Sequence, residues 1–74
     1  MEAKQRVSEA ARKLREETIA DRFADASSEL TAVPESDIPE DLRPLFQNLK
    51  SAITKREGNR DDLASKLERI AEAI

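Results

Sequence analysis

Five basic side chains stand in the first fifteen residues, at Lys4, Arg6, Arg12, Lys13 and Arg15. Lysine and arginine bind phosphate and carboxylate groups through charge-assisted hydrogen bonds. Only two acidic side chains, Glu2 and Glu9, stand among these five, so residues 1–15 carry a net charge of +3. The segment is therefore a candidate anion-binding patch. No aromatic side chain is present there to stack on a nucleic-acid base, and we favour the simpler interpretation of a solvated helix face.

Two further arginines, Arg56 and Arg60, interrupt an otherwise apolar heptad pattern. Polar side chains at such positions can fix the register and oligomeric state of a coiled coil at some cost in stability. With Glu16 as the expected partner of Arg56, these three residues form a predicted polar core layer. The alternative, which we favour, is that the arginine stems cover the edge of the apolar stripe while their guanidinium groups reach water.

The residue types that are missing exclude several kinds of site. The chain has no cysteine and no histidine, which removes thiolate nucleophiles, cysteine zinc sites and the commonest general base. Gly58 is the single glycine, so there is no glycine-rich phosphate loop. The acidic residues around position 37 do not match the spacing of an EF-hand loop. We therefore expect no enzymatic activity, cofactor, metal ion or small-molecule substrate.

The chain is short and highly charged. It has 74 residues, of which 39% are charged, and a net charge of −3. No apolar run is long enough to span a membrane, and the opening residues MEAKQRVSEA lack the apolar core of a secretory signal. We therefore expect a cytoplasmic protein with no membrane association. The initial methionine favours a complete small protein that forms one domain over residues 1–74.

Three prolines, Pro34, Pro39 and Pro44, divide the chain into two helical segments. Residues 2–32 lack proline and glycine and are rich in good helix formers, which predicts one long helix. A second long helix is predicted over residues 42–73, because spacings of four and three alternate without a slip. That pattern comprises Leu42, Phe46, Leu49, Ile53, Arg56, Arg60, Leu63, Leu67, Ile70 and Ile74.

The second helix has a possible break at Gly58. In that alternative, Gly58 ends one helix and Asn59 caps the next, with Asp62 three residues on. We favour the continuous helix, because a loop normally resets the phase of the pattern. The first segment is less regular and carries two apolar stripes that do not join, since the step from Leu14 to Ile19 turns the helix face by about 140°. The stripes are Val7, Ala10, Ala11 and Leu14, then Ile19, Phe23, Ala26, Leu30 and Val33.

Folding the two helices together predicts an all-α antiparallel hairpin, in which Ile19 faces Ile53. One hairpin cannot bury large side chains on both sides of a helix, and chains of this size often need a further source of stability. We therefore predict a symmetric dimer that forms a four-helix bundle. Its predicted interface consists of the apolar residues nearest the termini: Val7, Leu14, Leu63, Leu67, Ile70 and Ile74.

The expected function is that of a small non-enzymatic protein-interaction module, a regulator, adaptor or assembly subunit that acts as a helical homodimer. Its partner is an unknown protein, and the obligate partner is alternatively a different chain. A first alternative function is an RNA- or DNA-binding regulator that uses the basic N-terminal helix. This plan is similar to that of the Rop-type plasmid regulators in architecture only, with no shared motif. A second alternative is a chaperone-like or structural subunit of a larger helical assembly.

Overall fold

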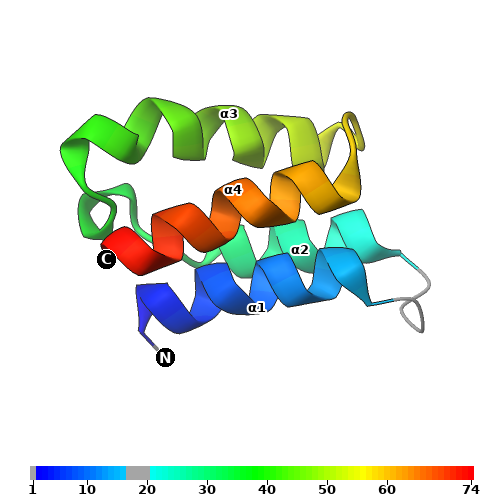
Figure 1. Cartoon of the computed structure of the whole chain (residues 1–74), viewed down its shortest axis with the longest axis horizontal. Coiled ribbons are helices and arrows are strands. Elements are labelled where there is room, and N and C mark those ends of the chain that lie inside the picture. Colours follow the sequence, from blue (N-terminus) through cyan, green and yellow to red (C-terminus); the bar gives the residue numbers. More distant parts are fainter. Residues whose placement is uncertain (1, 17–20) are drawn as a thin grey trace.

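Four α-helices make up most of residues 2–16 and 21–74, which the computed structural model describes (Figure 1). They are α1 (Ala3–Arg15), α2 (Arg22–Thr31), α3 (Arg43–Thr54) and α4 (Arg60–Ala73), with the short 3₁₀ turns η1 (Glu35–Asp37) and η2 (Glu40–Leu42) between α2 and α3. The helix α1 packs on both α4 and α2, and α3 packs on α2 and α4. The all-α prediction is confirmed. The predicted hairpin of two long helices, 2–32 and 42–73, is wrong, because each segment folds back on itself.

The first segment breaks between α1 and α2. The backbone is extended at Glu16, where α1 ends, and α2 begins after Asp21, whose side chain accepts a hydrogen bond from the Ala24 amide at 3.1 Å. The two helices run antiparallel (Figure 1), which explains why their apolar stripes do not share a phase. Each stripe faces the same core from its own helix. Ile19, which was expected to face Ile53, lies outside the described residues.

The second segment breaks at residues 55–59, so the alternative with two helices describes the structure and the continuous helix does not. Helix α3 closes in a Schellman motif, in which the amide of Glu57 donates to the carbonyl of Ala52 at 2.8 Å. Arg56 takes the left-handed position of this motif, with φ 58°, and Gly58 follows with φ 93°. Asn59 then caps α4. The apolar positions keep their four-three spacing across the break, because α3 and α4 face one shared core.

That core lies within one chain, so the predicted dimer is wrong. Of the six apolar residues assigned to a dimer interface, Val7, Leu14, Leu67 and Ile70 are fully buried and Leu63 is 5% exposed, whereas Ile74 is 38% exposed. The helix break at residues 55–59 brings α4 back against α1. This contact buries, within one chain, the apolar side chains that a two-helix hairpin would leave exposed. Buried alanines on both helices let them approach closely: Ala10, Ala11, Ala64 and Ala71.

Replacing Asn59 by alanine is expected to lower the free energy of unfolding by about 1 kcal/mol. The Asn59 side chain accepts hydrogen bonds from the amides of Asp61 and Asp62 at 2.9 and 3.1 Å, and alanine leaves both donors to water. Urea unfolding followed by circular dichroism measures the loss. Asn48→Ala is the matched control, because Asn48 is exposed inside α3, where alanine is the better helix former. An equal loss of unfolding free energy in both variants would contradict the role of Asn59 as the cap of α4.

Candidate functional site

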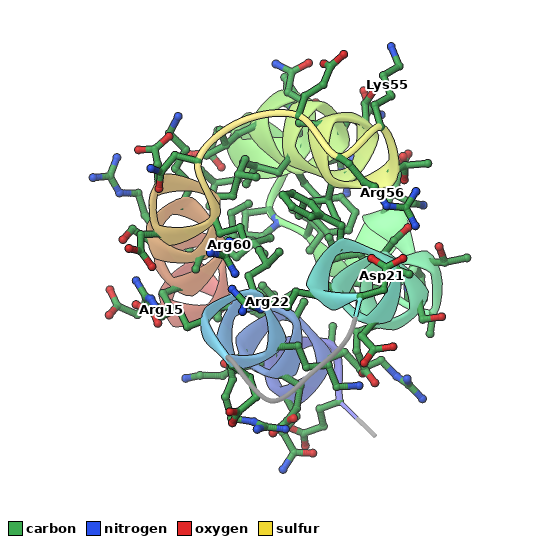
Figure 2. All side chains as sticks on the ribbon, turned by 90° about the vertical axis from the view of Figure 1, so that its right-hand side faces the viewer. Arg15, Asp21, Arg22, Lys55, Arg56 and Arg60 are labelled. Atoms are coloured by element: carbon green, nitrogen blue, oxygen red, sulfur yellow. The ribbon has the colours of Figure 1, made fainter. Side chains whose placement is uncertain are left out.

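Five basic side chains lie at one end of the four-helix bundle, the end at which α1 and α3 finish and α2 and α4 begin (Figure 2). We call this surface the cationic end. The chain turns between helices bring its basic residues together from parts of the sequence as far apart as positions 15 and 60. The five residues are Arg15, Arg22, Lys55, Arg56 and Arg60.

Two of these five arginine and lysine side chains bridge neighbouring helices. The guanidinium group of Arg15 pairs with Glu68 and also donates to the hydroxyl of Ser65 at 3.0 Å, which joins α1 to α4. The guanidinium group of Arg56 pairs with Asp21 and so joins the end of α3 to the start of α2. These contacts hold the helix ends together around the cationic end.

The side chains of the other three cations of this end, Arg22, Lys55 and Arg60, form no hydrogen bond or ion pair with another described residue. Arg22 is half-buried, whereas Lys55 and Arg60 are exposed. Acidic residues are at least as numerous at this end, at the close of α1, at the start of α2, in the turn after α3 and in the first turn of α4: Glu16, Asp21, Asp25, Glu57, Asp61 and Asp62. The surface is therefore mixed in charge, with three cations whose donors are open to a ligand.

The Asp21 carboxylate is held in its charged form. The hydrogen bond from Arg56 lowers the pKa of Asp21 below its usual value of 3.8, and the hydrogen bond from the Ala24 amide adds to this. Because the pKa of Asp21 is lower in the folded chain than in the unfolded chain, the ionised carboxylate stabilises the fold at pH values above the unfolded-state pKa. This contribution is lost as the pH falls through the folded-state pKa. The Asp21–Arg56 bridge should therefore hold at neutral pH and open in acid.

We expect the Asp21 carboxyl group to titrate below 3.8 in the folded protein, as measured by NMR of its carboxyl carbon. In Arg56→Gln its pKa should rise, because the largest cause of the lowering is removed. Arg69→Gln removes an arginine of α4 that does not touch Asp21 and serves as the control. A pKa of Asp21 that is the same in the Arg56→Gln variant and in the native chain would contradict the bridge.

The basic patch predicted on the N-terminal helix is largely paired within the chain. Lys13 and Arg6 both reach the carboxylate of Glu29 on α2, at 3.0 and 3.7 Å, and Arg12 pairs with Glu9 at 2.8 Å. The bond from Arg12 lowers the pKa of Glu9. Of the remaining two, Arg15 belongs to the cationic end, and Lys4 is exposed without a partner among the described residues.

The structure does not bring the three residues of the predicted polar layer together. Arg56 and Arg60 lie at the surface, because the break between α3 and α4 turns both away from the core. The carboxylate that pairs with Arg56 is that of Asp21, and Glu16 lies 3.8 Å from the guanidinium group of Arg12. Arg22 and Lys55 are not among the residues predicted from the sequence. The signal that could have found them is the pair of breaks after residues 15 and 54, which place both at one end.

Comparison of the sequence and fold with protein-family models, curated proteins and solved structures gives no significant match. Within residues 2–16 and 21–74, acidic side chains do not gather in groups of three that could hold a metal ion. No helix in this part of the chain is both long enough and apolar enough to cross a membrane. Any function proposed for the protein thus stands on the geometry of its own surface.

Proposed function

We propose that this protein is a small non-enzymatic interaction module that binds an acidic segment of a partner protein through its cationic end. The observation that carries this proposal is that Arg22, Lys55 and Arg60 gather at one end with no carboxylate partner among the described residues. The cations of α1, by contrast, are mostly paired within the chain. Donors without an internal partner are free to form charge-assisted hydrogen bonds with a ligand.

The net charge of −3 does not prevent this binding, because the individual cations of the cationic end, and not the charge of the whole chain, contact the ligand. The acidic turns η1 and η2 lie at the end opposite the cationic end (Figure 1), and the longest extent of the molecule is 32 Å. The Debye length is about 8 Å at physiological ionic strength, so charges at opposite ends are screened from each other. An approaching ligand therefore meets the local field of one end.

An acidic protein segment fits the cationic end better than a nucleic acid does. Duplex DNA presents a nearly continuous row of phosphates, about one charge per 1.7 Å, and some of them would meet Glu57 and Asp61. A protein segment can place its carboxylates opposite the cations alone.

The test compares two triple variants that both change the net charge from −3 to −6. The first, Arg22→Gln/Lys55→Gln/Arg60→Gln, removes the unpaired cations of the cationic end. The second, Lys4→Gln/Lys50→Gln/Arg69→Gln, removes three cations that also lack a described partner and do not belong to the cationic end. Lys50 lies nearest to that end, because it lines a shallow surface groove together with Lys55. The probes are a fluorescein-labelled deca-glutamate peptide and a labelled twenty-nucleotide oligouridylate. Fluorescence anisotropy at low and at physiological salt gives both affinities.

We expect the first variant to lose at least tenfold in affinity for deca-glutamate and the control variant to lose no more than threefold. Affinity should also fall as salt rises, because the contacts are between charged groups. The proposal is overturned if the native chain does not bind the peptide, if both variants lose affinity equally, or if the oligouridylate binds more tightly than the peptide.

A further inference from the structure

A groove lies between α2 and α3 and reaches the cationic end at Arg56. Its volume is about 360 Å³, which is at the small end of the range for ligand sites. Both helices line it, and Arg56, at the end of α3, lines it too. The lining residues are Phe23, Ala24, Ser27, Ser28, Thr31, Ile53, Thr54 and Arg56. The groove therefore combines apolar side chains, hydroxyl groups and one cation.

The apolar lining comes from both helices. Phe23 of α2 is half-buried and packs against the core from its edge, and Ile53 of α3 is fully buried. The ring of Phe23 thus leaves part of its surface open toward the groove, where water covers it in the free chain. An apolar side chain that enters the groove would remove this surface from water, which is favourable.

Of the four residues with hydroxyl groups that line the groove, Ser27, Thr31 and Thr54 use their protons within the chain and present acceptors. Thr54 Oγ1 donates to the Lys50 carbonyl and Thr31 Oγ1 to the Ser27 carbonyl, each at 2.8 Å. Because the Thr54 proton is used in this way, the 3.1 Å contact between Ser27 Oγ and Thr54 Oγ1 has Ser27 as its donor. The remaining lone pairs suit N–H donors, which the backbone of a bound peptide supplies.

Arg56 supplies the charge at the cationic end of the groove. Its φ of 58° is a left-handed conformation that glycine adopts most easily, so an arginine there is an outlier that the surrounding structure must hold in place. Only one of its terminal nitrogens donates to Asp21, and a guanidinium group has five N–H donors. The remaining donors can bind a carboxylate of a ligand while the bridge to Asp21 stays closed.

From this arrangement we infer that the groove receives one large apolar side chain of the acidic segment, next to a carboxylate that Arg56 binds. The inference rests on the proposed function and specifies the ligand further: an acidic peptide that carries an apolar residue among its carboxylates. The cationic end supplies attraction for the charges, and the groove supplies the preference for a peptide with the apolar residue.

The test uses two nine-residue glutamate peptides, with phenylalanine or serine at the centre. Both have the same charge, so the ratio of their affinities measures the groove alone. Ala24→Leu/Ser28→Leu fills the groove at two exposed positions on α2. Ala32→Leu adds the same side chain at an exposed position outside the groove and is the matched control. Circular dichroism checks that each variant keeps the helix content of the native chain.

We expect the native chain and the Ala32→Leu variant to bind the phenylalanine peptide at least fivefold more tightly than the serine peptide. In the groove-filled variant this ratio should fall below two. In Arg22→Gln/Lys55→Gln/Arg60→Gln both peptides should lose affinity in parallel. Two outcomes would overturn the inference about the groove and leave the proposed function unaffected. They are equal binding of the two peptides by the native chain, or an affinity ratio that stays at fivefold or more in the groove-filled variant. If the native chain binds neither peptide, both are overturned.

Discussion

Phe46→Ala is expected to lower the free energy of unfolding by about 3–5 kcal/mol. Phe46 comes from α3, is fully buried and belongs to the core that all four helices share. Alanine removes the apolar surface of the ring and leaves a cavity that the surrounding side chains fill only in part. Domains of this length are stable by about 4–11 kcal/mol, so the variant should be unfolded in part or at modest denaturant concentrations.

The other phenylalanine provides the control. Phe23 is half-buried at the edge of the core, so Phe23→Ala should cost about 1–2 kcal/mol and leave the chain folded. The chain has no tryptophan or tyrosine, so urea unfolding is best followed by far-UV circular dichroism. Equal losses of unfolding free energy in the two variants would contradict the central place of Phe46 in the core.

Leu67→Ala is expected to lower the free energy of unfolding by about 2–5 kcal/mol, with an unfolding midpoint that does not depend on protein concentration. Leu67 lies on α4, which packs on α1 of the same chain, and is fully buried there. Ile74→Ala is the matched control, since Ile74 continues the same apolar stripe but is 38% exposed. We expect that control to change stability by less than about 0.5 kcal/mol.

Protein concentration separates the single-chain core from a core shared between two chains. In a dimer, unfolding is coupled to dissociation, so the midpoint rises as the chain becomes more concentrated. Native protein should have the same midpoint over a hundredfold range of concentration, and sedimentation equilibrium should give the monomer mass of 8.3 kDa. An unfolding midpoint that rises with protein concentration would show instead that Leu67 and its neighbours are buried between two chains.

The candidate site could be anticipated only in part. The sequence shows that positive charge is enriched in residues 1–15, and Arg15 was singled out there. Which cations stay unpaired depends on carboxylates far away in the chain, such as Glu29 for Lys13 and Glu68 for Arg15. No local pattern encodes those pairings, because they arise only when helices pack side by side.

The helical class, the acidic connection between α2 and α3, and the apolar stripes that face the core can all be predicted from the sequence alone. These follow from local propensity and from the helical period, which act within a few residues. Asn59 supported the alternative with a break at Gly58, although a continuous helix satisfied the same period there. The phase jump between Leu14 and Ile19 is also present in the sequence, but one long helix over residues 2–32 was predicted in spite of it.

The choice between two long helices and four short ones depends on how the helices pack against one another. The apolar stripes can be buried by a second chain or by folding each segment back, and local propensity favours the longer helices. Folding back brings α4 against α1, which buries Val7, Leu14, Leu67 and Ile70 within one copy and turns Arg56 and Arg60 out to the surface. The same packing gathers the unpaired cations at one end, because two chain reversals must lie there together.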